Sequence, residues 1–422
     1  MLSKLLYNLF LTLYSVGVRV ASAWNFKARK WIRGRKNIFN TINSRLQTSN
    51  SKPIWMHCAS LGEFEQGRPL LEELKTKYPG QQIVLTFFSP SGFEVMKDYA
   101  GADHIFYLPM DSPANAQKFL DIVNPSLVLW VKYEYWFYYL DELKRRNIPV
   151  LLVSGIFRQS QPFFAWYGSI WKKMLGSFTH FFVQEEGSKQ LLSKLGFNNN
   201  VSVNGDTRFD RVIEIADKYT PVPYITEFCG NAPVIVAGST WEEDEIELLH
   251  FIKIHPAVKF VIAPHEINEE NLNDVKEEFE NSIFYSELEK TPNPKPQTTN
   301  ILIIDNIGML SRLYRYATVA YVGGGFGADG VHNVLEAAVY GKPVVFGPVY
   351  EKFIEATGLV NAGGGISIDG PITLEENLNK LLHNEAERER MGKAAKDYVY
   401  AQAGASKKII QFIQENRLLT SL

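Results

Sequence analysis

The stretch PIWMHCASLGEFEQGRPLLEELKTKY, residues 53–78, changes its hydrophobic pattern halfway along. It opens with a short apolar run, turns at Ser60-Leu61-Gly62, and continues as a longer amphipathic run. The first pattern predicts a buried strand and the second predicts a helix. Because a strand followed at once by a helix is the first half of a strand-helix-strand unit, this stretch predicts an α/β fold.

The same alternation continues toward the C-terminus. Short apolar runs such as QQIVLTFF, SLVLWVKY and IPVLLVSG alternate with amphipathic runs, and the alternation restarts with PVIVAGS after a turn-rich break. This rhythm implies right-handed crossovers and parallel sheets covered on both faces. We therefore predict two Rossmann-like domains, residues 51–210 and 234–395, joined by a linker, residues 211–233, and facing a cleft at the carboxyl ends of the strands. Residues 396–422 are expected to form helices that pack back on the first domain.

Positive charge is concentrated at the N-terminal end. Ten lysines and arginines precede Glu63, the first acidic residue, although the whole chain of 422 residues has a formal net charge of −2. Residues 5–24 form an apolar run about as long as a bilayer core requires, and six cations follow between Asn25 and Asn37. This order is opposite to that of a cleaved signal peptide. We therefore predict that residues 1–37 are a membrane anchor and that the bulk of the protein is cytoplasmic.

Two alternatives remain for this segment. Arg19 interrupts the apolar run and weakens the case for a clean span, so one alternative is an amphipathic helix lying in the membrane interface with its cations on anionic lipid. The other alternative is an N-terminal helix buried in the globule.

Two strand ends in the second half carry small, donor-rich turns. Gly238-Ser239-Thr240 follows VIVA, and we expect Ser239 or Thr240 to cap the helix that begins at Trp241 and to leave amides for a ligand. Gly323-Gly324-Gly325-Phe326-Gly327 follows VAYV and precedes a helix predicted near Val331, and glycine lets a backbone approach a phosphate without a Cβ in the way. Neither turn is a Walker loop or a dinucleotide fingerprint. Together they favour a nucleotide phosphate site, and the alternative is that both are ordinary turns.

Glu336 stands one helical turn after His332 and Asn333. We expect these residues on roughly one face of a short helix, where the carboxylate can accept hydrogen bonds from both hydroxyls of a ribose. The alternative is a surface glutamate without a ligand.

Six segments in this order resemble the 3-deoxy-D-manno-octulosonic acid (Kdo) transferases of lipopolysaccharide synthesis. They are HCASLGEFEQGRPLLEEL, LTFFSPSG, GDTRFDRV, GSTWEEDE, YVGGGF and HNVLEAAVYGKPVVFGP, and residues 59–63 and 332–348 are the most specific pieces. The resemblance implies the two-Rossmann GT-B fold, a place on the cytoplasmic face of the inner membrane, and inverting transfer of Kdo from CMP-Kdo to a lipid A precursor. It also implies no metal or other cofactor. Cys58 and Cys229, far apart in sequence, predict neither a metal site nor a disulfide framework, and no nucleic acid partner is expected.

The resemblance implies that Glu63, in Ser60-Leu61-Gly62-Glu63, is the general base. A base must remove the proton of the attacking sugar hydroxyl, whereas the departing phosphate needs no proton, so one carboxylate suffices. The alternative is that Glu63 is only a first-turn acid stabilised by the helix dipole.

The full site prediction combines these arguments. The donor set contains Ser239, Thr240, Pro264, His265, Gly323, Gly324, Gly325, Phe326, Asn333, Glu336 and Arg208, and the weaker acceptor or transition-state set contains Ser60, Gly62, Ser91, Glu134 and Arg158. Arg208 and Arg158 are candidates to hold the Kdo carboxylate or the phosphate, and the alternative for each is a structural salt bridge. Lys132 and Trp241 differ from the residues that are common in the family.

Two other functions share parts of these patterns. A sugar-nucleotide epimerase or hydrolase can have two Rossmann halves and a ribose-binding glutamate, but it has no need of a hydrophobic, basic anchor. A membrane-tethered nucleotide-sugar sensor would keep the pocket of the second half but has little reason to keep Glu63 at a glycine turn. Both features favour the transferase.

Overall fold

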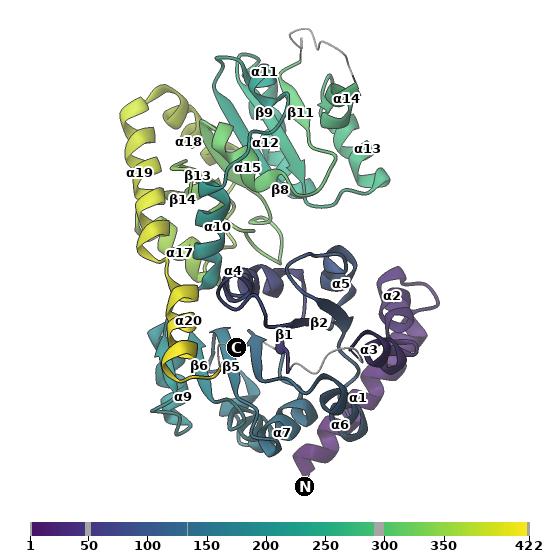
Figure 1. The fold of residues 1–422 in the computed structure, drawn as a ribbon. Helices are drawn as coiled ribbons and strands as arrows, with labels where there is room; N and C mark the ends of the chain where they lie inside the picture. The colour runs from purple at the N-terminus through teal and green to yellow at the C-terminus, as the bar shows by residue number, and fades with distance from the viewer. Residues whose placement is uncertain (1, 47–51, 133, 291–298, 420–422) are drawn as a thin grey trace. The chain divides into compact units, whose positions relative to one another are not determined.

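The chain folds into two compact α/β units (Figure 1). The computed structural model describes residues 2–46, 52–132, 134–290 and 299–419. Unit 1 contains residues 1–211 and 403–422, and unit 2 contains residues 212–402. Each unit is built on a seven-stranded parallel sheet with helices between successive strands, which confirms the predicted pair of Rossmann-like domains.

The strand order of unit 1 is β3-β2-β1-β4-β5-β6-β7. Its strands are β1 (Ile54–Cys58), β2 (Ile83–Phe87), β3 (His104–Tyr107), β4 (Leu127–Val131), β5 (Val150–Gly155), β6 (His180–Val183) and β7 (Val201–Val203). Its helices are α1 (Leu2–Ala21), α2 (Phe26–Arg35), α3 (Ile38–Leu46), α4 (Leu61–Lys77), α5 (Pro90–Met96), α6 (Pro113–Val123), α7 (Phe137–Arg145), the 3₁₀ turn η1 (Pro162–Phe164), α8 (Ser169–Leu175), α9 (Glu186–Lys194) and α20 (Ala405–Glu415).

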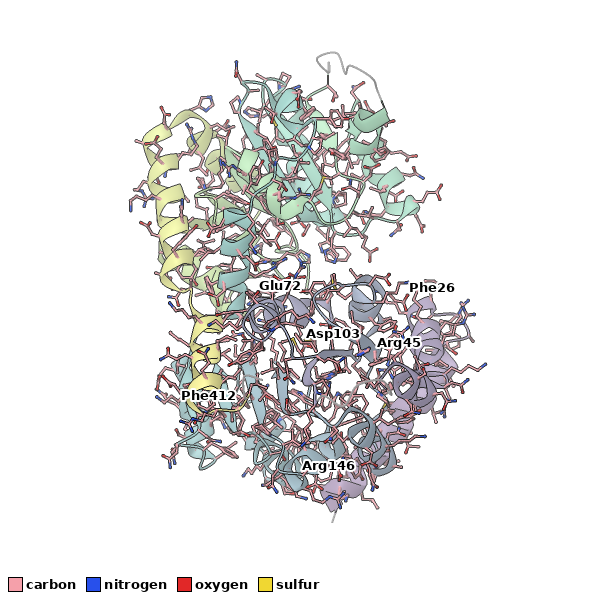
Figure 2. The ribbon with its side chains drawn as sticks, in the orientation of Figure 1. Phe26, Arg45, Glu72, Asp103, Arg146 and Phe412 are labelled. Carbon is pink, nitrogen blue, oxygen red and sulfur yellow. The ribbon has the colours of Figure 1, made fainter. Side chains whose placement is uncertain are left out.

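The central strands of unit 1 are buried on both faces. Every residue of β1, β2, β4 and β5 is buried, as expected of parallel strands covered by helices on both sides. Alternate side chains divide between two cores: Trp55 joins the core that includes α1, α6 and α7, whereas Met56 joins the core that includes α4 and α20. On α20, Phe412 contacts His180 of β6, with ring centroids 4.3 Å apart (Figure 2).

The N-terminal helices α1 and α2 pack as part of unit 1. Tyr7 and Leu11 on α1 and Trp31 on α2 are buried in its core, because the Tyr7 hydroxyl donates a hydrogen bond to Asp111 at 2.7 Å and the apolar side chains pack beside it. Among the described residues, no single helix is long and apolar enough to cross a membrane. Only α1 and α2 together reach the required length and composition, and they are bent by 118°.

Unit 2 repeats the design with the strand order β10-β11-β9-β8-β12-β13-β14. Its strands are β8 (Val234–Thr240), β9 (Lys259–Pro264), β10 (Ile283–Phe284), β11 (Ile301–Ile303), β12 (Val319–Val322), β13 (Val344–Phe346) and β14 (Gly365–Ser367). Its helices are α11 (Ile225–Cys229), α12 (Glu242–Ile254), α13 (Glu269–Glu278), α14 (Tyr285–Lys290), α15 (Leu310–Leu313), the 3₁₀ turn η2 (Tyr314–Tyr316), α16 (Leu335–Ala338), α17 (Ile354–Asn361), α18 (Pro371–His383) and α19 (Glu385–Ala401).

The segments that join the two units differ from the predicted boundaries. The predicted linker, residues 211–233, is partly helical, because α10 (Thr207–Asp217) begins in unit 1 and α11 lies in unit 2 with its apolar side chains buried. The return to unit 1 falls at residue 403, later than the predicted residue 396, because α19 runs to Ala401 within unit 2. The helix that packs against α4 of unit 1 is α20.

Candidate active site

Glu63 lies in the first turn of α4, directly after β1. Its carboxylate accepts hydrogen bonds from the backbone N–H groups of Ala59 and Ser60, the latter at 3.2 Å, and the residue is 8% exposed. The sequence Ser-Leu-Gly-Glu therefore folds as a helix start that the glutamate closes by reaching back to the residues before it. This matches the first-turn alternative, and a carboxylate still has further lone pairs for an incoming hydroxyl.

The environment of Glu63 changes its acidity. Burial and the negative charge of Glu134 raise the pKa of the Glu63 carboxyl to about 7, although the two backbone N–H groups and Lys132 act in the opposite direction. A general base works best when its pKa is close to the working pH. The position therefore combines a carboxylate with the acidity that the predicted chemistry needs.

Glu134 and Lys132 follow the adjacent strand, β4. The Oε2 atom of Glu134 accepts a hydrogen bond from Trp136 Nε1 at 3.2 Å and lies 3.8 Å from His57 Nε2. Lys132 has a left-handed backbone with φ of +61°. Such strain in a residue other than glycine concentrates at functional sites, so it marks this strand end. Lys132 and His57 were absent from the predicted site.

Arg208 forms a buried ion pair in unit 1. Its Nε and Nη2 atoms donate to Asp206 Oδ2 at 2.9 and 2.8 Å, and Gln66 Nε2 donates to the same carboxylate. Burial alone would raise the pKa of Asp206, but the positive charges of Arg208 and Lys132 hold it below its usual value. The structure therefore realises the salt-bridge alternative for Arg208, and donor binding by Arg208 stays a prediction.

The other residues predicted for unit 1 lie at different strand ends. Ser91 is exposed at the start of α5 after β2, and its hydroxyl lies 3.0 Å from that of Ser89, whose N–H donates to Ala59 at 2.7 Å. This contact joins the ends of β1 and β2 beside Ser60 and Glu63. Gly62 faces open space, since no atom lies within 4 Å of a Cβ added there. Arg158 is exposed after β5, and its backbone N–H donates to Gln161.

In unit 2, strand β8 ends in a distorted turn. Ser239 has a left-handed φ of +56°, and the pairing of β8 with β9 shifts register between Gly238 and Thr240. The Thr240 hydroxyl donates to Glu245 at 2.6 Å, so it does not cap α12. The prediction that Ser239 or Thr240 caps this helix is wrong, because Asp244 accepts from the Trp241 N–H at 3.0 Å and performs that role.

Asp244 also determines which backbone N–H groups of the glycine loop can bind a ligand. Its buried carboxylate accepts from the Gly324 N–H at 2.8 Å and from the Tyr321 hydroxyl at 2.7 Å, while the Gly323 N–H donates to Gly238. These two glycine amides are therefore used within the protein and are not left for a phosphate. The physical reason for glycine here is close backbone approach: a Cβ on Gly323 would meet the Ser239 carbonyl at 2.4 Å.

Three aromatic rings stack beside this loop. The Trp241 and His265 rings lie 4.6 Å apart, those of His265 and His332 lie 4.4 Å apart, and both pairs are nearly parallel. Trp241 Nε1 donates to His332 Nε2 at 2.9 Å. Burial and neighbouring His265 lower the pKa of His332 to about 4, which keeps its imidazole neutral and able to accept. Trp241 and His332 were not in the predicted site set, although the sequence had placed His332 on one face with Asn333 and Glu336.

The segment around Glu336 differs from the predicted helix near Val331. Helix α16 begins only at Leu335, whose N–H donates to Asn333 Oδ1 at 3.3 Å. The Asn333 amide donates in turn to Glu336 Oε1 at 3.1 Å, so the two predicted donor residues are in direct contact. His332 lies before the helix. Pro264 is buried at the end of β9, and Phe326 is half-buried in the glycine loop. No group of three or more His, Cys, Asp or Glu side chains in the described part of the chain is arranged to hold a metal ion.

The chain is similar in sequence to known 3-deoxy-D-manno-octulosonic acid transferases. The family model described as 3-deoxy-D-manno-octulosonic-acid transferase (kdotransferase) matches residues 34–211, from the end of α2 through all seven strands of unit 1. The chain is 27% identical over 375 residues to the 3-deoxy-D-manno-octulosonic acid transferase of Haemophilus influenzae, covering 86% of each chain. It is 27% identical to that of Aquifex aeolicus, covering 78% of this chain and 86% of the relative.

Solved structures support the fold. The UDP-GlcNAc 2-epimerase of Neisseria meningitidis bound to UDP-GlcNAc superposes with a TM-score of 0.61 at 18% identity, covering 86% of this chain and 100% of the epimerase. MurG of Acinetobacter baumannii superposes with a TM-score of 0.54 at 13% identity, covering 86% of this chain and 99% of that chain. Because epimerases and transferases share it, this fold alone does not select the reaction.

Proposed function

The chain is a homologue of the 3-deoxy-D-manno-octulosonic acid transferases, and on this premise we propose that it transfers Kdo from CMP-Kdo to a lipid A precursor in lipopolysaccharide biosynthesis, with inversion at the anomeric carbon. One observation carries the mechanism. The segment matched by the family model contains Glu63, a buried carboxylate whose pKa is raised to about 7.

In this mechanism Glu63 takes the proton of the attacking acceptor hydroxyl. The backbone N–H groups of Ala59 and Ser60 hold the carboxylate in one orientation, and burial together with the charge of Glu134 keeps its pKa high enough for proton transfer near neutral pH. A base aligned before the reaction starts contributes through position as well as acidity. The departing CMP phosphate needs no proton, so the mechanism uses a single carboxylate.

Unit 2 holds the donor in this proposal. Glu336, oriented by the Asn333 amide, accepts hydrogen bonds from the ribose hydroxyls. The Ser239 hydroxyl, which has no hydrogen-bond partner among the described residues, donates to the phosphate beside the glycine loop. The stacked Trp241, His265 and His332 rings supply a flat surface suited to a nucleobase.

We also propose that α1 lies in the membrane interface. Seven apolar side chains on one face of this helix are exposed, while Tyr7 and Leu11 on the opposite face pack in unit 1. The exposed set is Leu5, Leu6, Leu9, Phe10, Leu13, Val16 and Val20. A docked helix with an exposed apolar face fits a lipid boundary better than a span. Phe26, the first residue of α2, is exposed as well (Figure 2).

The reaction is tested by the mass of its product. The purified full-length protein is incubated with CMP-Kdo and a lipid A precursor, with Glu63→Gln as the control. We expect release of CMP and a glycolipid heavier by one or more Kdo residues. An epimerase would change the donor without adding mass to the lipid, a hydrolase would release CMP and free Kdo, and a sensor would do neither. An acceptor of unchanged mass contradicts the proposal.

A further inference from the structure

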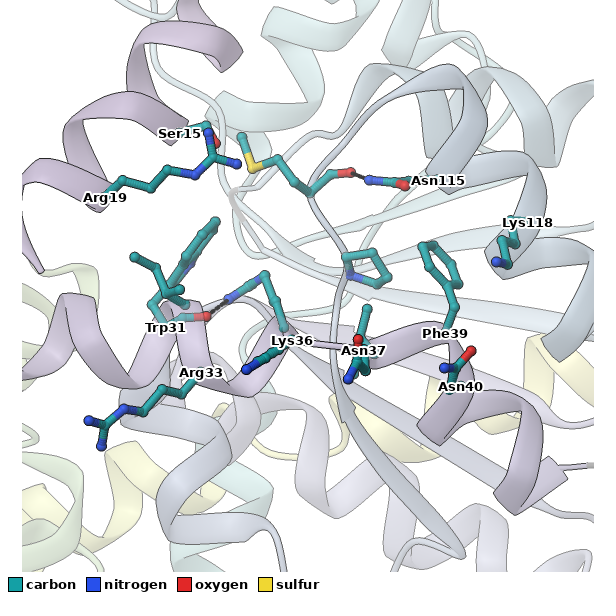
Figure 3. Close-up of a pocket in the computed structure, with 15 residues that line it drawn as sticks. Ser15, Arg19, Trp31, Arg33, Lys36, Asn37, Phe39, Asn40, Asn115 and Lys118 are labelled. Carbon is teal, nitrogen blue, oxygen red and sulfur yellow. Dashed lines mark hydrogen bonds between the residues drawn. The ribbon is translucent and has the colours of Figure 1, made fainter.

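A cavity of about 570 Å³ lies between the N-terminal helices and the body of unit 1 (Figure 3). Its wall is formed by α1, α2, α3 and the segment from β3 to α6. Its volume is in the range of sites that hold small molecules or headgroups. None of the predicted catalytic or donor residues lines it, so it is separate from the candidate active site.

The wall of this cavity is strongly basic. Arg19 on α1, Lys36 after α2 and Lys118 on α6 line it from three segments, Arg33 adds a fourth positive charge, and no carboxylate is among its lining residues. Within the described residues, no ion pair joins any of these four side chains to an acidic group. Like charges gathered without counter-charges repel one another, and a bound anion removes that cost.

Arg35 and Trp31 provide the floor of the cavity. Arg35 differs from the four other cations because it is already bound within the protein. It donates to the carbonyls of Leu108 and Phe88, and its Cζ atom lies 3.9 Å from the centre of the Trp31 ring. Trp31 is 8% exposed, and its indole N–H has no hydrogen-bond partner among the described residues. An unpaired buried donor carries a free-energy cost, and Trp31 lines both this cavity and a second one beside Tyr14 and Phe88.

The cavity adjoins the exposed apolar face of α1. Arg19 lines the cavity, and Val16, one helical turn before it on α1, belongs to that exposed face. A ligand with both an anionic group and apolar chains would satisfy the two surfaces together. We propose that the cavity binds the phosphate of an anionic membrane phospholipid, attracted by the cations that line it, with the acyl chains along α1. This inference rests on the proposed membrane association and not on Kdo transfer.

The test compares two full-length variants that each lose two positive charges. Lys36→Gln/Lys118→Gln removes cations of the cavity, whereas Lys27→Gln/Lys172→Gln removes exposed cations of the same unit that do not line it. Binding is measured by co-sedimentation with vesicles of phosphatidylcholine alone or with one-third phosphatidylglycerol. We expect phosphatidylglycerol to strengthen binding of the parent, the cavity variant to lose roughly tenfold or more of that gain, and the control to lose less than about threefold.

Two further measurements test whether the phosphate comes from a lipid or from a soluble molecule, and whether it binds in this cavity. Trp31→Phe keeps the ring against Arg35 but removes the N–H, and we expect it to weaken phosphatidylglycerol binding about threefold or more without changing the melting temperature by more than a few degrees. Binding of glycerol 3-phosphate at millimolar concentration is also measured, to test whether the protein binds a soluble phosphate. Equal losses in the two double variants indicate diffuse attraction and overturn the site. Binding of glycerol 3-phosphate with no effect of phosphatidylglycerol overturns the lipid.

Discussion

The Glu63 carboxylate accepts a hydrogen bond from the Ser60 N–H at 3.2 Å, so the residue proposed as the base also closes the first turn of its own helix. A substitution that removes the carboxylate entirely would disturb both the reaction and the helix start. Glutamine is the informative replacement, because its amide oxygen can still accept from the backbone but cannot take a proton at neutral pH.

Glu63→Gln is expected to lower the rate of Kdo–lipid formation at least about a hundredfold, since loss of a general base typically costs about 10² to 10⁴ in rate. Affinity for CMP, measured by calorimetry, should stay near that of the parent, because the base acts only as the hydroxyl attacks. The matched control is Glu65→Gln on the same helix, where Glu65 forms an ion pair with Arg211. Turnover of Glu63→Gln within a few fold of the parent contradicts the mechanism.

The rate should depend on pH through the Glu63 carboxyl. The base acts only when deprotonated, so kcat/KM is expected to rise with pH up to about 7 and then to level off as far as this group is concerned. Glu134→Gln removes the like charge that helps to raise this pKa and should move the rise to lower pH. A pH–rate profile of both proteins checks the shift. Identical profiles would show that Glu134 does not raise the pKa of the base.

The same raised pKa predicts that the stability of the protein falls as pH rises, whereas the rate increases. Because the folded pKa of about 7 exceeds the ordinary value of 4.5, the folded protein holds this proton more tightly than the unfolded chain. The stabilising contribution is complete below pH 4.5 and is lost as pH rises through 7. Glu63→Gln cannot ionise, so the difference in melting temperature between the variant and the parent should move in the variant's favour from pH 5 to pH 8. A constant difference would indicate an unshifted carboxyl.

Glu336→Ala is expected to weaken CMP binding by about 1 to 3 kcal/mol, the scale of removing a charged hydrogen-bond partner. Calorimetry on a folded variant measures the change. Glu376→Ala, an exposed position on α18 in the same unit, is the control and should leave the affinity unchanged. Unchanged affinity in Glu336→Ala would place the nucleotide elsewhere.

Membrane association should depend on one face of α1 only. Leu9 and Leu13 are 51% and 61% exposed, so Leu9→Gln/Leu13→Gln should move the protein from the membrane pellet to the supernatant while its melting temperature changes little. Leu11→Gln, on the buried face, should lower the melting temperature instead, because Leu11 is 7% exposed in the core of unit 1. Deleting residues 1–37 is a poorer test, since Trp31 and Arg35 would be lost from that core. Persistence of the double variant in the pellet at high salt contradicts the interfacial role.

The local sequence was sufficient to predict much of the fold and the position of the leading site residue, Glu63. The alternation of short apolar runs with amphipathic runs predicts two parallel sheets, because strands buried on both faces have no polar period and helices have one. Short β10 and β14 at the edges, Ile283–Phe284 and Gly365–Ser367, give no such signal. The Ser-Leu-Gly-Glu turn predicts a helix start with an acid at its third position, which is where Glu63 lies.

Tertiary structure alone decided the rest. Helix α1 is apolar on two faces, and hydropathy along the chain cannot tell that Tyr7 and Leu11 contact unit 1 while Leu9 and Leu13 do not. The acidity of Glu63 depends on burial and on Glu134, which follows a different strand. The Gly324 N–H, in the loop after β12, donates to Asp244 of helix α12. The physical reason is that the local pattern records backbone periodicity, whereas burial, pKa and hydrogen-bond partners depend on which distant groups the folded sheets bring within a few ångströms.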